Sequence, residues 1–309
     1  MTAPALGPFR LSSEDAPRVT GWGRRRGRVR RLFHDVYVSA KVPITPEVLA
    51  RGALLLAEPG SYVSHHTAAR LWGGIVPDTD RTDVTSPRVR LRATGILGHR
   101  VRANAEVTTF HGIPLTTPVQ TFLDLGLYLD LVDLVVLGDS LVRANRVTVR
   151  ELVEQAARRR GPGSRRARVA AALVRAGVDS GMESRLRMLM VLAGLPEPVI
   201  NHKIYWADGT VRWRFDLSFP QFRLIIEYDG RQHADSPTQW RGDVGRREWF
   251  DDNDWRIVVS GSTDIYRTPA RTLTRITGAM RARGMAVPRL REDWRRHFPS
   301  MPEDLAHPA

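Results

Sequence analysis

The segments Phe215–Phe219 (FDLSF) and Leu224–Gly230 (LIIEYDG) decide the expected fold of the second half of this 309-residue chain. Apolar and polar residues alternate in the first segment, which is the period of a strand that buries one face. The second segment is a short apolar run that ends in acidic residues. Asp216, Glu227 and His233 therefore lie on or beside two predicted strands.

The two strands are predicted to form a hairpin. If residues 221–222 form a two-residue loop, Phe219 opposes Leu224, Leu217 opposes Ile226, and the two carboxylates face each other. Like charges in this position destabilise a sheet unless they share a proton, have a basic neighbour or bind a divalent cation. A cation is the first interpretation.

Each of these acidic residues also has a structural interpretation. The strand carboxylates could be solvated charges balanced by Arg212 and Arg214. Glu183 follows Ser180 by three residues, which is the spacing of a helix capping box. Asp229 and the glycine after it could form a turn.

The surrounding sequence predicts further elements. A helix begins at Ser180 and ends near Gly194, a strand covers residues 199–206, a second helix ends near Asp252, and a buried strand covers residues 255–259. The expected order is αβββαβ, within an α/β (α+β) fold class.

This order and its acidic residues resemble the PD-(D/E)xK-type nuclease domain related to very-short-patch repair endonucleases, over about residues 179–283. The resemblance implies a restriction-endonuclease-like core and metal-dependent hydrolysis of a phosphodiester bond. Where the broader superfamily has a lysine two residues after the second acid, this sequence has Asp229. The role of the lysine would then fall to His233, Arg214 or Lys203. The implied site has Asp216 and Glu227 as metal ligands, Glu183 as an outer carboxylate, and Asp229 and His233 completing it, with Asp229 as a further metal ligand.

The chemistry of these residue types agrees with this prediction. Phosphodiester hydrolysis needs an activated water and a cation near the phosphoryl oxygens, and carboxylate ligands select Mg²⁺ or Mn²⁺. The usual pKa of histidine is about 6.5, so His233 could act as a general acid or base. The sequence has no cysteine and no close histidine pair at zinc spacing, which makes a zinc site an unfavoured interpretation.

The net charge of +14 indicates a polyanionic partner, most simply DNA. Residues 1–178 contain 27 basic and 15 acidic side chains, whereas residues 179–309 contain 20 and 18, so the excess lies in the first part. Basic runs are also often solvated surfaces. The predicted nucleic-acid contacts are the arginines of an early cluster and of the nuclease-like segment: Arg24, Arg25, Arg26, Arg28, Arg30, Arg31, Arg214, Arg246 and Arg247.

The first part of the chain is expected to be a mixed α/β region. It has predicted helices at 45–56 and 61–73, short strands between 81 and 115, and a helical run at 118–129, 131–144, 149–159 and 164–176. The motifs LFHDVY (32–37), SHHTAA (64–69) and GIPLTTP (112–118) resemble AbiEi-type antitoxin proteins over about residues 8–150. This resemblance implies a DNA-binding repressor. His65 and His66 are adjacent and should point in different directions on a helix, so a buried structural role for one of them is expected rather than a metal site.

Three segments are therefore predicted: a basic antitoxin-like region (1–178), a nuclease-like domain (179–285) and a loosely packed tail (286–309). The leading hypothesis is a Mg²⁺-dependent DNA endonuclease. The alternatives are a DNA-binding regulator with a non-catalytic nuclease fold and, third, an RNA-binding protein, which is disfavoured because most tryptophans, Trp206 included, are expected to face the core. No export signal or apolar membrane segment is recognised, so a cytoplasmic protein is expected, with a partner protein or a second copy as possible companions.

Overall fold

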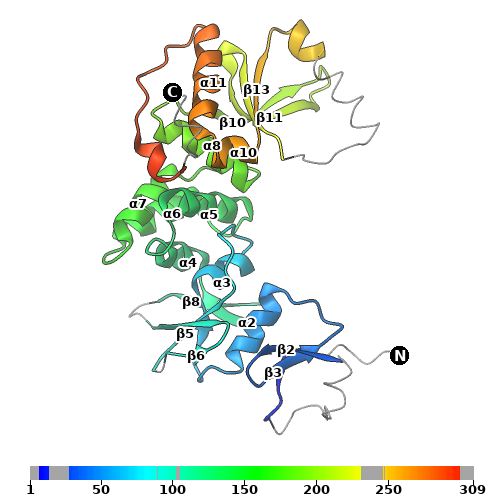
Figure 1. Ribbon diagram of the computed structural model, residues 1–309, viewed down its shortest axis with the longest axis vertical. Coiled ribbons are helices and arrows are strands. Elements are labelled where there is room, and N and C mark those ends of the chain that lie inside the picture. The colour runs from blue at the N-terminus through cyan, green and yellow to red at the C-terminus, as the bar shows by residue number, and fades with distance from the viewer. Residues whose placement is uncertain are drawn as a thin grey trace. The chain divides into compact units, whose positions relative to one another are not determined.

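The computed structural model describes residues 7–13, 28–88, 90–101, 105–230, 246 and 248–299. The chain divides into two compact units, Met1–Val174 and Arg175–Ala309, four residues before the predicted boundary (Figure 1). The described residues form helices together with antiparallel and mixed sheets, which is the predicted α+β class. No helix among them is both long and apolar enough to cross a membrane.

Unit 1 begins with a small antiparallel sheet that packs beside a helix. Its strands are β1 (Phe9–Arg10), β2 (Val29–Phe33) and β3 (Val36–Ser39), in the order β1-β3-β2. Helix α2 (Pro46–Leu54) begins where the Thr45 side chain accepts a hydrogen bond from the Val48 amide. Phe33, Ala53 and Val84 belong to one buried cluster, so this sheet and α2 share a core with the larger sheet.

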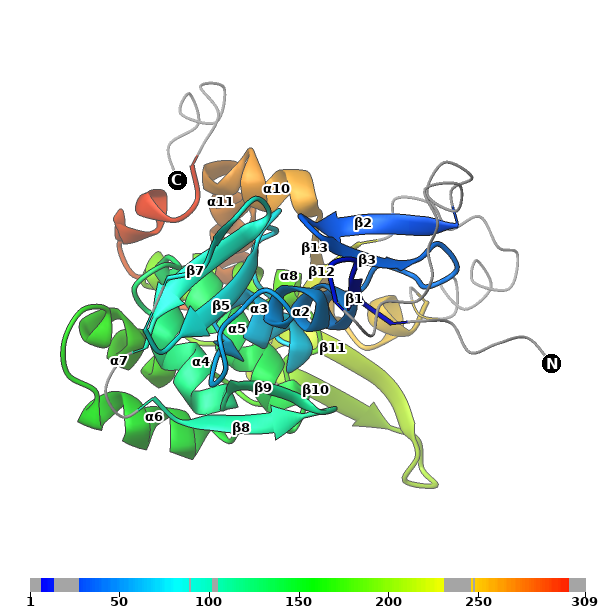
Figure 2. The same cartoon turned by 90° about the horizontal axis from the view of Figure 1, so that it is seen from below.

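The larger sheet of unit 1 has six strands in the order β6-β7-β5-β4-β9-β8. Strands β5 and β7 lie side by side and run parallel (Figure 2), whereas β4 pairs antiparallel with β5. Helix α3 (His65–Leu71) begins two residues after β4 ends. The strands are β4 (Tyr62–Val63), β5 (Thr82–Ser86), β6 (Arg92–Ala93), β7 (Ile96–Arg100), β8 (Val107–Phe110) and β9 (Ile113–Thr116).

Four helices complete unit 1, and each lies within the range predicted for it. Three of them begin at a side chain that accepts a hydrogen bond from the first turn: Thr117, Asp130 and Thr148. These local caps explain why the sequence located the helices well. The helices are α4 (Pro118–Leu125), α5 (Leu131–Arg143), α6 (Val149–Arg158) and α7 (Ser164–Leu173).

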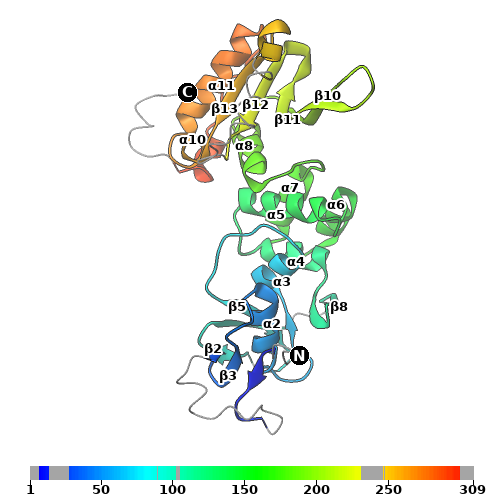
Figure 3. The same ribbon diagram turned by 90° about the vertical axis from the view of Figure 1, so that its right-hand side faces the viewer.

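Unit 2 contains a four-stranded sheet in the order β10-β11-β12-β13, with β12 and β13 parallel. The hairpin of β10 and β11 extends beyond the other strands (Figure 3). Residues 246 and 248–252 are helical and lie between β12 and β13, so the elements follow one another in the predicted order. The elements are α8 (Gly181–Leu192), β10 (Val199–Tyr205), β11 (Val211–Phe219), η1 (Pro220–Phe222), β12 (Leu224–Tyr228), β13 (Arg256–Ser260), α10 (Ser262–Tyr266), α11 (Pro269–Ala282) and η2 (Asp293–Arg296).

The predicted register of the β11–β12 hairpin is confirmed, but the predicted loop is wrong. Leu217 pairs with Ile226, and Phe219 pairs with Leu224. Four residues connect the strands instead of two: a single 3₁₀ turn is followed by Arg223 in the left-handed region at φ 48°. The strand pairs end at Leu217, because beyond it the side chain of Asp216 accepts the Tyr228 amide at 3.1 Å. The two acidic residues are therefore not a regular cross-strand pair.

The segment after Val287 is not a loose tail as far as Pro299. Trp294 is fully buried, and Phe298 is 2% exposed. The Arg291 amide donates to the carbonyl of Ala193 at the end of α8. Aromatic side chains that are solvated in an isolated tail thus become part of the unit 2 core.

Candidate functional site

Acidic and basic side chains from two strands and a helix line a cavity of about 220 Å³ in unit 2. Asp216 lies on β11, Glu227 lies on β12, and Asp229 follows β12, where its amide donates to the Ser260 carbonyl. Arg214 and Arg246 line the same cavity. The pattern predicted from the two strands therefore does bring three carboxylates to one place.

Asp216 has a strongly perturbed carboxyl group. Burial raises its pKa to about 6, and the negative charge of Glu183 acts in the same direction. The Tyr228 amide, Arg246 and Arg214 oppose this increase without cancelling it. An aspartate that titrates near neutral pH beside a second carboxyl group is typical of a functional site, although structural clusters also show it.

Glu227 forms an ion pair with Arg246, which lines the same cavity. An Arg246 guanidinium nitrogen donates to Oε1 of Glu227, and both side chains are mostly buried. Arg246 also lies over the Phe215 and Phe250 rings at 5.7 and 5.4 Å. Of the positions predicted to replace the superfamily lysine, Arg214 lines the cavity, and Arg246, which was not among them, lines it as well.

Glu183 makes the capping contacts that were one of the two roles the sequence left open, and its catalytic role stays a prediction. It is 7% exposed in the first turn of α8, its amide donates to the Ser180 hydroxyl, and its carboxylate accepts the Asp179 amide at 3.0 Å. It also raises the pKa of Asp216. Glu183 is thus a helix-capping residue whose charge reaches the cavity.

Several predicted residues lie outside the described part of the chain. These are His233, Arg247, Arg24, Arg25 and Arg26, and their roles stay predictions.

The described residues of the early arginine cluster are exposed. Arg28 precedes β2, and Arg30 and Arg31 lie on it. Arg30 donates to the Val42 carbonyl and Arg31 to the Phe33 carbonyl, so both are partly held in place. They form a basic surface on unit 1 rather than a part of the unit 2 cavity.

Trp206 does not face the core as expected. It is 50% exposed at the end of β10, and the Arg212 guanidinium lies 4.0 Å from its ring centroid. Tyr205 beside it is 56% exposed. The β10–β11 hairpin thus presents an aromatic and basic tip, which weakens the sequence argument against an RNA-binding protein.

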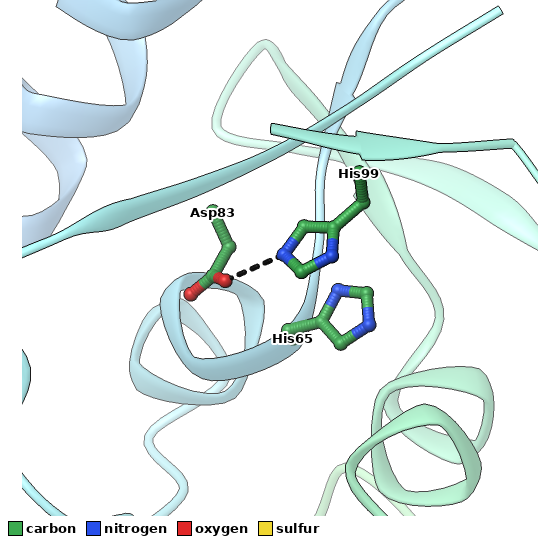
Figure 4. Close-up of side chains that lie close together, drawn as sticks. All are labelled: His65, Asp83 and His99. Atoms are coloured by element: carbon green, nitrogen blue, oxygen red, sulfur yellow. Dashed lines mark hydrogen bonds and ion pairs between the residues drawn. The ribbon is translucent and has the colours of Figure 1, made fainter. Parts of the chain in front are cut away.

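A second group of polar residues lies in unit 1, and only part of it was considered from the sequence. Nε2 of His99 lies 2.8 Å from Oδ1 of Asp83, and the ring of His65 stacks on His99 with centroids 3.8 Å apart (Figure 4). All three residues are buried. Among the described residues, they alone offer three ligand atoms within 4.8 Å of one another; Asp216, Glu227 and Asp229 share their cavity without meeting that distance.

His65 is buried and hydrogen-bonded to Ser64, as expected for one histidine of the pair. His65 and His66 were expected to point in different directions on a regular helix. His65 has φ 49° and leaves the helical geometry, and His66 Nδ1 lies 3.7 Å from Oδ2 of Asp83. Asp83 and His99 were not predicted as members of this group. They lie on β5 and β7, and no local sequence pattern predicts that these two strands pair in parallel.

Comparisons with known proteins show relatives without stated activities. No protein-family model matches the chain. The chain is 28% identical over 256 residues to the uncharacterized proteins MT2308 and Rv2248 of two Mycobacterium tuberculosis strains. That alignment covers 82% of this chain and 92% of each relative. Because 256 residues exceed the length of either unit, the relatives share parts of both units.

A crystal structure of the RV2827C protein from Mycobacterium tuberculosis has a more distant similarity. It has 15% identity and a TM-score of 0.36, and the match covers 62% of this chain and 77% of that one. A similarity at this level supports no argument about function.

Proposed function

We propose that the protein is a metal-dependent DNA endonuclease whose active site is the unit 2 cavity. The observation that supports this most is the raised pKa of Asp216, which results from burial beside Glu183. Two carboxyl groups held close together destabilise the folded state unless a cation or a proton accompanies them. Proteins retain such arrangements mainly where the site has a function.

The donor set suits Mg²⁺ or Mn²⁺ because its ligands are carboxylate oxygens. Asp216 and Glu227 would hold the ion, Glu183 would act from behind Asp216, and Asp229 would be a further ligand. Mg²⁺ commonly takes only one or two carboxylates and completes its shell with water and phosphate, so a closed three-ligand cluster is not required. When bound, the ion would supply Lewis-acid stabilisation of the phosphoryl oxygens and an acidified water.

The two arginines of the cavity would bind the substrate. Guanidinium groups bind phosphate oxygens in a bidentate manner, and Arg214 is 53% exposed while its NH2 lies 2.7 Å from Asp179. Arg246 now neutralises Glu227. We propose that Arg246 transfers to a phosphate oxygen of the DNA when Glu227 binds the ion.

Unit 1 would hold the nucleic acid through its basic surface. Replacing the exposed Arg28, Arg30 and Arg31 with glutamine should reduce the slope of log affinity against log salt by about 2 to 3, if each contacts one phosphate. An unchanged slope would assign these residues to solvated surface. DNA as partner also makes the cytoplasm the expected compartment.

Cleavage of supercoiled plasmid tests the proposal directly. The purified full chain should nick plasmid with Mg²⁺ or Mn²⁺ and be inactive with a chelator. Asp216→Asn should abolish cleavage and preserve DNA binding. Asp208→Asn is the matched control. Asp208 is an exposed residue in the β10–β11 turn of the same sheet, and its carboxylate accepts hydrogen bonds from Thr210.

A DNA-binding regulator is the second candidate, and the Arg246–Glu227 ion pair favours it. This arginine can neutralise the cavity permanently and so stand in for a cation. The regulator hypothesis predicts DNA binding without cleavage under every metal condition. It also predicts that the loss of folding free energy in Arg246→Gln exceeds the loss of DNA-binding free energy in Asp216→Asn.

A further inference from the structure

A second cavity, of about 550 Å³, lies in unit 1 and plays no part in the proposed cleavage. The imidazole rings of His65 and His99 line it together with Tyr62 and Tyr128. The Tyr128 ring meets both imidazoles edge-on, at 5.0 and 5.9 Å between centroids. The volume lies within the usual range for small-ligand sites of about 300 to 1,000 Å³.

Three arginines, two on strands β6 and β7 and one in the segment before β6, give this cavity a positive charge. Arg90, Arg92 and Arg100 line it, and Arg90 donates to the Gly98 carbonyl at 2.5 Å. A Cβ atom at Gly98 would lie 2.1 Å from the Leu91 carbonyl oxygen, so glycine allows the segment that carries two of the arginines to lie against β7. The position of these arginines therefore follows from the packing of β6 on β7.

Among the described residues that line the cavity, the one carboxylate is already neutralised. Asp124 accepts from the Gln120 amide at 2.9 Å and from Arg159 at 3.1 Å. The three cavity arginines thus exceed the uncompensated negative charge. This balance favours an anionic ligand.

Buried hydrogen bonds hold the two imidazoles in place. The Thr85 hydroxyl donates to Ser64 at 2.8 Å, and Nδ1 of His65 lies 2.8 Å from the same Ser64 oxygen. Nε2 of His99 lies 2.8 Å from Oδ1 of Asp83. Both rings therefore line the cavity in fixed orientations.

The geometry of the two rings opposes a metal site. The ring planes are within 18° of parallel, with centroids 3.8 Å apart. The lone pairs of imidazole nitrogens lie in the ring planes, so those of two stacked rings run side by side and cannot meet at one ion. Coordination would require a ring to leave the stack and its hydrogen bonds (Figure 4).

We propose that this cavity binds a phosphate monoester of a nucleotide, with Arg92 and Arg100 as donors to the phosphate. Guanidinium groups match phosphate geometry, and the cavity is larger than a phosphate alone requires. The exposed Tyr128 ring offers an aromatic surface to the base. The same chemistry is presented by a free mononucleotide and by the phosphorylated end of a DNA strand. The proposal does not depend on cleavage by unit 2.

Calorimetric titration of the full chain, in buffer that contains a chelator, measures ligand affinity and tests this site. The probes are adenosine 5′-monophosphate, adenosine, and one oligonucleotide with a 5′-phosphate or a 5′-hydroxyl. At least one phosphorylated probe should bind about tenfold or more tightly than its unphosphorylated counterpart, because charge-assisted hydrogen bonds are added. Binding of the mononucleotide identifies the free ligand as sufficient, whereas binding of the phosphorylated strand alone identifies a strand end.

Two arginine variants with the same net charge separate the site from the general basic surface. Arg100→Gln should weaken binding of the phosphorylated probe about tenfold. Arg88→Gln should change it less than about twofold, because Arg88 lines the neighbouring cavity and not this one. Both arginines are exposed, so neither substitution endangers folding.

Three results would overturn the proposal. The first is equal affinity for phosphorylated and unphosphorylated probes. The second is an equal loss in Arg88→Gln and Arg100→Gln, which would show unspecific attraction. The third is tight Zn²⁺ binding, in a titration without chelator, that is lost in His99→Gln while no phosphorylated probe binds.

Discussion

Replacing Asp216 with asparagine should stabilise unit 2 at neutral pH. The pKa of Asp216 is raised from 3.8 to about 6 in the folded state. Protonated Asp216 is therefore favoured in the folded state, and its ionisation costs folding free energy that grows between pH 4 and 6 and stays constant above. A shift of about two pKa units corresponds to about 3 kcal/mol. Solvent screening at this partly exposed side chain reduces the expected gain to about 2 kcal/mol.

Asparagine retains the local geometry that the test requires. Its side-chain oxygen can still accept the Tyr228 amide, as Asp216 does at 3.1 Å. Only the charge beside Glu183 is removed. The stabilisation should therefore report the electrostatic cost of the site and not a change in packing.

Urea denaturation followed by tryptophan fluorescence measures the effect, because six of the eight tryptophans belong to unit 2. With a chelator present at pH 7.5, the urea concentration at the midpoint of the unit 2 transition should be about 1 M higher in Asp216→Asn. This assumes that the free energy of unfolding falls by about 2 kcal/mol per M urea. Near pH 4 the two proteins should be equal. Added Mg²⁺ should narrow the difference at pH 7.5, because the cation stabilises only the protein with the aspartate.

The control is Asp208→Asn, which should not stabilise at any pH, because hydrogen bonds from Thr210 lower the pKa of Asp208. A variant Asp216→Asn that is less stable than the natural sequence at pH 7.5 would refute the reasoning. A gain that does not change between pH 4 and 7.5 would do so as well, since it could not come from ionisation.

Three further predictions concern stability. Asp83→Ala should destabilise unit 1 by about 3 kcal/mol in urea denaturation, because His99 loses a buried acceptor; Asp133→Ala, in the first turn of α5, should cost far less. Trp294→Ala should destabilise unit 2 by about 3 to 5 kcal/mol, and a change below about 1 kcal/mol would support the prediction of a loosely packed tail. Burial lowers the pKa of His66, so the unfolded state binds more protons and the stability of unit 1 should fall as pH drops below about 6.5. This fall should be smaller in His66→Gln.

The sequence predicted those features that depend on neighbouring residues. The alternation in β11 fixed which residues face the core, and that pattern together with the turn position gave the register between Leu217 and Ile226. The four-residue loop preserved this register although its length was predicted wrongly. Helices were predicted to start at residues 45 and 149, and in the structure the side chains of Thr45 and Thr148 cap these first turns.

The candidate site in unit 2 was predicted in part. Asp216, Glu227 and Asp229 were found because two adjacent strands carry them, whereas Glu183 was named through the resemblance to the PD-(D/E)xK-type nuclease domain. The Arg246–Glu227 pair was not foreseen. Its arginine comes from a helix after the hairpin, and the sequence does not specify the direction in which that helix returns to the sheet.

The sequence by itself determined the α+β class, the order of elements, the hairpin register and the basic character of the first part of the chain. These follow from the spacing of apolar residues, from helix caps and from composition. The first two depend on a few neighbouring residues, and composition does not depend on the order of the residues. Only the tertiary structure decided that His65, Asp83 and His99 meet, that three arginines line their cavity, and that Trp294 is buried. The physical reason is that parallel pairing of β5 with β7, and packing of a terminal segment on α8, join residues whose separation along the chain leaves no periodic signal.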